Sequence, residues 1–160
     1  MCSSDLGYEV IDPVTVLIAP LSKMTSEDPA RTPLFATDPT EDMAHVWQAG
    51  GIGPARLDIM RRCTLPKTCV ALTEGGQTAA VAFAALHDGL VMCHAVEVLD
   101  RFRRRGLGRD IMLAVLGWAQ DQKAHSVSVL TTRANTAALA LYKGMGMTEA
   151  GGYHYRIRQG

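Results

Sequence analysis

The sequence predicts an α/β fold in which a single mixed, mostly antiparallel sheet is flanked by helices. Three observations lead to this prediction. Short apolar segments follow one another closely in the middle of the chain and are separated by glycine-containing turns. Apolar residues further along recur at helical spacing. The 160 residues include 48% hydrophobic and 20% charged side chains, which is typical of one globular domain with its own core.

The first strand is expected over residues 8–19, where β-branched side chains dominate, with a break near Pro13. Residues 20–40 contain four prolines among Ser, Thr and Asp, and they predict a linker or a long loop. A helix is expected to open at Thr40, because its hydroxyl and the acids that follow can satisfy free amides. This helix runs towards Gln48.

A glycine-rich break over residues 50–54 ends this helix. The helix that follows is expected to bury Ala55, Ile59 and Cys63 on one face. The other expected elements are strands over 68–72, 79–86, 91–99 and 126–131, a helix with Leu107, Ile111, Val115 and Trp118 on one face, a helix over 135–143, and two short strands within 147–158.

The chain divides into three parts on this interpretation. Residues 1–6 resemble the translation of a sequencing-adapter scar and are set aside as non-native, although an ordinary terminus is the alternative. Residues 7–39 form an N-terminal strand with the proline-rich linker, which could be the end of a truncated upstream region. Residues 40–160 form the main domain.

The net charge is zero, with 16 basic and 16 acidic residues, but the charges are unevenly distributed. Residues 1–100 carry 6 Lys or Arg against 13 Asp or Glu, whereas residues 101–160 carry 10 against 3. The basic part could hold an anion and the acidic part could attract a cation. A neutral total does not favour a general nucleic-acid binder.

No membrane or metal partner is expected. The apolar runs are shorter than the ~20 residues that a membrane-spanning helix needs, and no secretory signal is visible. The cysteines form no CxxC pair and no Cys/His cluster with zinc spacing, so reduced thiols in the cytoplasm are expected. They are Cys2, Cys63, Cys69 and Cys93.

The strongest chemical signal is the motif Arg103-x-x-Gly106-x-Gly108, between an expected strand and an expected helix. Free amides at a helix start bind phosphate oxygens, and glycine lets the backbone approach closely. The pattern matches neither a P-loop nor a dinucleotide-binding turn. We expect it to bind a pyrophosphate, the alternative being a solvated basic turn. The side chains that would add positive charge and forked donors are Arg101, Arg103, Arg104, Arg105 and Arg109.

A second motif, Asn135-x-x-Ala138-x-x-Leu141-Tyr142, begins 27 residues after Gly108. Together the two motifs resemble the signature of the GCN5-related N-acetyltransferase (GNAT) superfamily, and the resemblance covers about residues 40–160. It implies the GNAT-type sheet, with 40–160 as the acetyltransferase domain. It also implies acetyl-CoA as co-substrate and a primary amine, on a small molecule or a protein, as acceptor.

The resemblance also implies roles for individual residues. The pyrophosphate would be held by the turn of Arg103, Arg104, Arg105, Gly106, Leu107, Gly108 and Arg109. Val96 and Val98 would line the pantetheine arm, with the Val98 backbone paired to it like a neighbouring strand. Independently of the resemblance, the tetrahedral oxyanion of acyl transfer needs a donor, and the Val98 amide would serve. Asn135 would hold the coenzyme from the next loop, and Tyr142 would protonate the departing thiolate.

The general base is left open between two residues and a chain of water molecules. A lysine-like amine has a pKa of ~10.4, so a group that accepts its proton is useful at neutral pH. His94 titrates near neutrality. Glu97 is the rival, although strand alternation places it on the face opposite His94 unless a β-bulge intervenes. Either residue could instead be structural, His94 in packing and Glu97 in a salt bridge to the arginines.

The main alternative function is a CoA-binding module that acts as a sensor or interaction domain without catalysis. A covalent route through Cys93 is disfavoured, because only His94 beside it offers activation. The sequence leaves the chain as a monomer or a homodimer and does not identify the amine.

Overall fold

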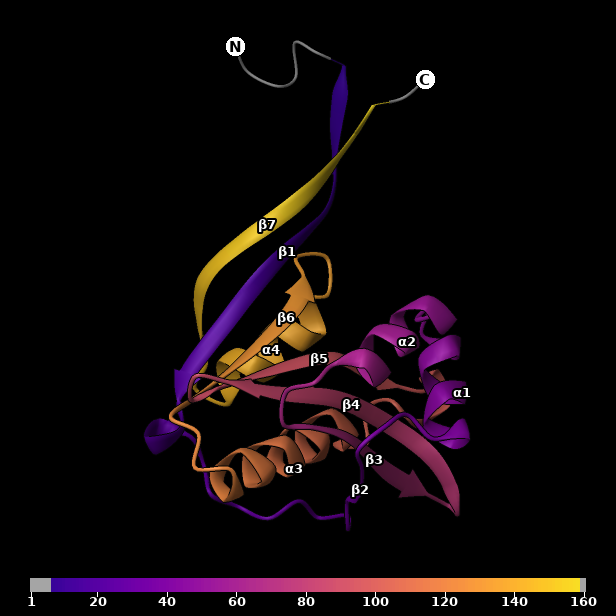
Figure 1. Cartoon of the computed structure of the whole chain (residues 1–160), viewed down its shortest axis with the longest axis vertical. Helices are drawn as coiled ribbons and strands as arrows, with labels where there is room; N and C mark the ends of the chain where they lie inside the picture. The colour runs from indigo at the N-terminus through magenta and orange to yellow at the C-terminus, as the bar shows by residue number, and fades with distance from the viewer. Residues whose placement is uncertain (1–6, 159–160) are drawn as a thin grey trace.

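A computed structural model describes residues 7–158, so the expectation for residues 1–6 lies outside the described residues. Its centre is one seven-stranded sheet in the order β2-β3-β4-β5-β6-β1-β7 (Figure 1). Among these described strands, β5–β6 is the one parallel pair. The predicted mixed, mostly antiparallel sheet is therefore confirmed. The strands are β1 (Tyr8–Pro20), β2 (Leu34–Ala36), β3 (Lys67–Glu74), β4 (Gln77–His87), β5 (Leu90–Val98), β6 (Ser126–Thr132) and β7 (Thr148–Arg158).

The helices connect the strands and cover both faces of the sheet. They are α1 (Glu41–Ala49), α2 (Pro54–Arg62), α3 (Leu107–Asp121) and α4 (Thr136–Gly144), with short 3-10 turns η2 (Leu21–Lys23) and η3 (Asp100–Phe102). Thr40 caps α1 as expected, because its hydroxyl accepts a hydrogen bond from the Met43 amide at 3.3 Å. No helix within residues 7–158 is both long and apolar enough to cross a bilayer.

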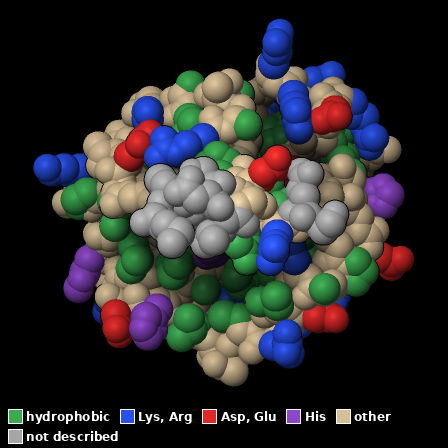
Figure 2. Space-filling view, turned by 90° about the horizontal axis from the view of Figure 1, so that it is seen from above, with side chains coloured by type: hydrophobic (Ala, Val, Ile, Leu, Met, Phe, Trp, Pro, Cys, Tyr) green, Lys and Arg blue, Asp and Glu red, His purple; other side chains and the backbone are tan. Residues whose placement is uncertain are grey.

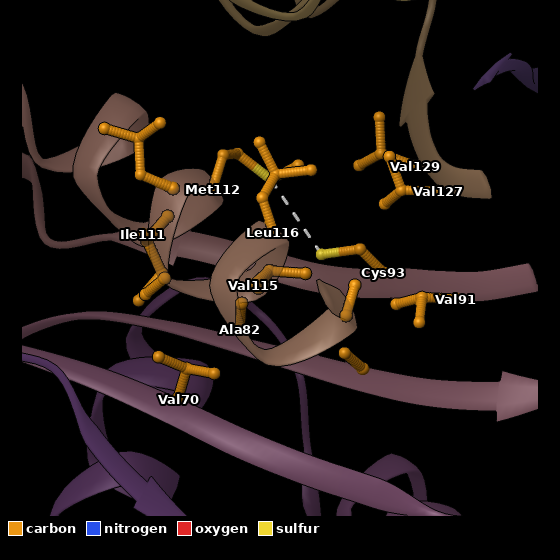
Figure 3. Packing of buried hydrophobic residues seen from close by; sticks show 14 of the residues in the cluster. Val70, Ala82, Val91, Cys93, Ile111, Met112, Val115, Leu116, Val127 and Val129 are labelled. Atoms are coloured by element: carbon orange, nitrogen blue, oxygen red, sulfur yellow. Dashed lines mark hydrogen bonds between the residues drawn. The ribbon is translucent and has the colours of Figure 1, made fainter. Parts of the chain in front are cut away.

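Two hydrophobic clusters form, one on each face of the sheet. The alternation of β4 separates them: Ala80, Ala82 and Ala84 belong to the cluster with α3, whereas Val81 and Phe83 belong to the cluster with α1 and α2. Helix α3 lies across the first of these faces and buries its apolar side against the strands (Figure 3). Small alanines on β4 let this long helix approach the sheet closely.

Some expectations need correction. In α2 the buried residues are Leu57 and Met60, whereas Ile59 is 60% exposed, because the helix begins at Pro54 and turns a different face to the sheet. The two short strands expected within residues 147–158 are one continuous strand, β7. The glycine pair that suggested a turn is part of the ladder, since Gly151 and Gly152 pair with Val16 and Thr15 of β1, and a register shift follows at Ala150.

The amino-terminal segment is more ordered than its prolines suggest. The break expected near Pro13 is a register shift between Ile11 and Val14, where Asp12 has a φ of 45°. The expected loop over residues 20–40 contains η2 and also β2, which adds a strand to the sheet beside β3.

The outer ends of β1 and β7 pair as a two-stranded ribbon that extends beyond the helices (Figure 1). Large apolar side chains on it are exposed, among them Val10, Tyr155 and Ile157. In the space-filling view from this end, hydrophobic side chains lie mostly below the grey residues, and Lys and Arg side chains lie mostly above them (Figure 2).

Candidate active site

The predicted phosphate turn joins η3 to α3. Gly106 is the N-cap of α3, has a φ of +79° and makes no side-chain cap, and Arg104 also has a positive φ of 61°. Within residues 7–158, the amides from Arg104 to Arg109 donate no hydrogen bond to another group. A run of unsatisfied N–H groups at the start of a helix attracts anions, and the helix dipole adds to the attraction.

The two positions of this motif require glycine for different physical reasons. Gly106 needs the left-handed conformation, which a side chain disfavours. Gly108 lies in α3 where a Cβ would come 3.1 Å from the Leu141 Cδ2 atom, so its small size lets α3 and α4 pack closely. Gly106 therefore shapes the turn with the exposed amides, and Gly108 allows the close packing of α3 against α4.

The arginines of the turn are exposed, and several of them pair with carboxylates. Arg103 lies 3.0 Å from Asp100 and Arg109 lies 2.8 Å from Glu27. Arg104 forms no ion pair with any residue that the structure describes. The turn thus combines free backbone donors with a positive rim, as the sequence predicts for an anion site.

The strand β5 leaves an open edge beside this turn. Its pairing with β6 extends only from Leu90 to Cys93. The Leu99 amide donates to the Ala79 carbonyl of β4 at 2.9 Å, and peptide groups alternate along a strand. The N–H and C=O groups of Val96 and Val98 therefore point to the open edge, where an extended chain could pair with them.

A β-bulge in β5 decides the placement of the two candidate bases. Ala95 has a φ of 54°, and the register places His94 opposite Phe83 but Glu97 opposite Val81. Phe83 and Val81 share one face of the sheet, so His94 and Glu97 share it too. The opposite placement given by simple alternation is therefore wrong, and the alternative with a bulge is correct.

Trp47 holds this bulge from the neighbouring helix. Its indole N–H donates to the Ala95 carbonyl over 2.8 Å, and its side chain is fully buried between α1 and the sheet. Left-handed backbone at an alanine costs energy and persists only where its surroundings fix it. Trp47 supplies that constraint. From the sequence, the tryptophan is only one more apolar residue of the first helix.

Glu97 lines a cleft of about 270 Å³ between the carboxyl end of α1 and the arginine turn. Burial raises the pKa of its carboxyl above the ordinary value, although Arg103 and Arg56 act in the opposite direction. Gly50 closes one side of the cleft so tightly that a Cβ there would overlap the Glu97 carboxyl group. A half-buried carboxyl with a raised pKa, in a cleft, is suited to accept a proton.

The side chain of His94 lies deeper on the same face. Burial lowers its pKa, and the nearby charge of Arg56 lowers it further. It is therefore neutral around pH 7 and capable of accepting a proton. Unlike Glu97, His94 does not line the cleft beside the arginine turn.

Tyr142 and Asn135 come from α4 and its cap. Tyr142 is buried within the cluster around α3, and burial is the main reason that its pKa lies well above the ordinary value, with Cys93 and Glu97 contributing. Its hydroxyl forms no hydrogen bond to a described residue. Asn135 caps α4, because its Oδ1 atom accepts from the Ala138 amide at 3.1 Å.

Cys93 is placed away from this chemistry. It lies on the α3 face of β5, fully buried, with its thiol 3.9 Å from the Met112 sulfur (Figure 3). Burial raises the pKa of Cys93 to about 12, so the thiol stays protonated and is a poor nucleophile. Among the described residues, no group of three or more His, Cys, Asp or Glu is arranged to hold a metal ion.

The sequence model of the acetyltransferase (GNAT) family matches residues 32–147, which is most of the chain. The chain belongs to the GNAT family. The match contains both sequence motifs, the bulged strand β5 and the cleft beside it. The family resemblance and the fold prediction are thereby confirmed, whereas the roles of individual residues stay predictions.

Two curated relatives are similar to this GNAT domain. A Bacillus subtilis (strain 168) protein described as uncharacterized N-acetyltransferase YobR is 23% identical, over 98% of this chain and 66% of its own length. N-acetyltransferase family 8 member 3 of Mus musculus is 34% identical over 54% of this chain and 40% of its own length. The chain thus spans less than two thirds of either relative.

A solved structure of a GCN5-related N-acetyltransferase from Kribbella flavida has a TM-score of 0.67. It is 19% identical to this chain and aligns with 98% of it and with 62% of the solved chain. At this identity the likeness concerns the fold. It includes nearly the whole described sheet of the GNAT domain.

The Trp47–Ala95 bond should contribute measurably to stability. Trp47→Phe keeps a ring but removes the indole donor, leaving the Ala95 carbonyl without this partner. We expect the free energy of unfolding to fall by about 1–3 kcal/mol in urea denaturation. Trp118→Phe is the matched control, because no hydrogen bond among the described residues links Trp118 to β5. Equal losses in the two variants would contradict this role for the indole.

The raised pKa of Glu97 has a consequence for stability. The folded chain binds this proton more tightly than the unfolded chain. The protonated carboxyl therefore contributes fully to the free energy of unfolding below its ordinary pKa, and this contribution is lost as the pH rises through the raised pKa. Glu97→Gln should therefore raise the thermal midpoint at pH 7, with the gain shrinking towards about pH 4. Scanning calorimetry across this pH range measures the effect, and a gain independent of pH would refute the assignment.

Proposed function

We propose that this GNAT domain transfers an acetyl group from acetyl-CoA to a primary amine. The proposal rests on three features that lie next to one another. The free amides of the Arg104–Arg109 turn, the open edge of β5 and the Glu97 cleft follow one another along the same stretch of chain. They provide a place for a diphosphate, for an extended arm and for a reacting amine.

The residues fit the coenzyme as a substrate. The turn would bind the two phosphates through its amides, and the arginine rim would add charge-assisted contacts. The Val96 peptide groups and the Val98 carbonyl would pair with the amides of the pantetheine arm, because they point to the edge that β6 leaves open. Asn135 would contact the arm with its amide nitrogen, since its oxygen already caps α4.

The reaction would then be a direct transfer. The acceptor nitrogen attacks the thioester carbon, a C–N bond forms and the C–S bond breaks. The proton of the amine goes to Glu97, directly or through water, and the thiolate takes a proton from Tyr142. The Val98 amide would stabilise the oxyanion. No covalent enzyme intermediate is needed, in line with the buried, protonated Cys93.

The base can be identified from pH profiles. We expect Glu97→Gln to lower kcat/KM by about 10²–10⁴-fold and to abolish the acidic limb of the profile, because a carboxyl must lose its proton to serve as base. His94→Gln should keep that limb, and Tyr142→Phe should lower kcat. Thiol release from acetyl-CoA, measured with a panel of amines of known pKa, gives the profiles.

Other outcomes of this experiment are equally informative. Loss of the limb in His94→Gln, and not in Glu97→Gln, would make His94 the base. CoA binding without thiol release for any amine would favour a sensor or interaction module over an enzyme. Absence of CoA binding would refute the proposed function altogether.

Gly50 offers an independent test of the Glu97 cleft. Gly50→Ala should displace the Glu97 carboxyl and lower kcat/KM by roughly tenfold or more, since small displacements of catalytic groups are costly. Gly53→Ala is the matched control, because beyond its own chain neighbours no atom of the described residues lies within 4 Å of its added Cβ, and both glycines have a φ of −86°. Steady-state kinetics of the two variants decide the matter, and equal activities would argue against Glu97.

A further inference from the structure

The segment of residues 25–33, which we call the strap, runs beside α3 and touches the phosphate turn. The sequence suggests only a linker here, and the match to the family begins at residue 32. Two charged side chains of the strap nevertheless reach the amino end of α3. Glu27 pairs with Arg109 at 2.8 Å, and Arg31 reaches three separate groups.

The guanidinium of Arg31 uses each of its nitrogens. Nε donates to Glu74 on β3 at 2.7 Å, Nη1 donates to Asp110 in α3 at 2.7 Å, and Nη2 donates to the Arg105 carbonyl at 3.1 Å. The side chain is 23% exposed, so solvent competes only in part for these bonds. A planar fork with fixed donors can hold three acceptors in one arrangement, which a lysine cannot do.

The bond to Arg105 fixes the direction of a neighbouring amide. In a trans peptide the carbonyl of one residue and the N–H of the next point in opposite directions. Because the Arg105 carbonyl points to Arg31, the Gly106 N–H points away from the strap. This N–H is one of the free donors of the phosphate turn. Arg31 thus sets the direction of the Gly106 N–H without contacting it.

The bond to Asp110 solves an electrostatic problem. Asp110 is buried in the first turn of α3, where it also accepts from the Ala30 amide at 3.1 Å. An unpaired carboxylate at this place would be costly to bury and would repel a diphosphate bound at the same helix end. Arg31 neutralises it while leaving the amides of the turn free.

We propose that Arg31 is a positioning residue for CoA binding: it orients the Arg105–Gly106 peptide towards the diphosphate and cancels the charge of Asp110. This inference rests on the proposed function, because it assumes that the turn binds the diphosphate. It extends the coenzyme site to a residue outside both sequence motifs.

The test uses Arg31→Lys and the double variant Arg31→Ala/Asp110→Asn, in which no carboxylate is left unpaired at position 110. Both should bind CoA roughly tenfold more weakly in titration calorimetry, the factor that corresponds to one charge-assisted hydrogen bond. KM for acetyl-CoA should rise by the same factor, while kcat at saturation changes less than about twofold. Arg61→Ala is the control, because its exposed pair with Asp58 lies on α2.

A spectroscopic readout separates this inference from the proposed function. In the ligand-free chain, the Gly106 amide resonance should shift in both variants, whereas that of Gly89, in the β4–β5 turn at the opposite end of β4 from Glu74, should not. Folded variants with parental CoA affinity, or an unmoved Gly106 resonance, would overturn the role of Arg31. A parent chain that binds no CoA would overturn the proposed function, and the resonances would still decide whether Arg31 orients the turn.

Discussion

The bulge at Ala95 is the constraint on which the candidate site depends. Without it, His94 and Glu97 would lie on opposite faces of β5, and Glu97 would point into the cluster around α3. With it, Glu97 reaches the cleft under α1. The bulge lies just beyond the last β5–β6 pair, at Cys93. The bulge is thus associated both with the half-buried Glu97 carboxyl and with the part of the β5 edge that β6 leaves unpaired.

The electrostatics of the site are balanced between backbone and side chains. Free amides at the start of α3 provide directional donors, and the arginines provide positive charge, part of which pairs with nearby carboxylates. Asp110 would disturb this balance if it were unpaired. Its pairing with Arg31, from a distant part of the chain, keeps the helix start available to an anion.

The sequence predicts the strands and helices of the domain well, because their periodicity and turn residues act locally. It also locates the turn with free amides, since glycine at a strand-to-helix junction exposes the backbone and the arginines beside it supply charge. It does not reveal that Trp47 and Arg31 support the site. Their contacts, to Ala95 and to Arg105, join residues more than forty positions apart. Likewise, the face of Glu97 depends on a bulge that alternation alone cannot reveal.

The position of β1 in the sheet has a consequence for how the molecule assembles. This strand pairs with β6 and β7, so Val14 meets Thr132 and Tyr153, both over a hundred residues away. Such distant pairings impose a large entropic cost before they yield stability and slow the search for the native topology. The pairing of β1 therefore needs residues from nearly the whole chain. Closure of this side of the sheet belongs to a late stage of folding, after the helix-covered centre has formed.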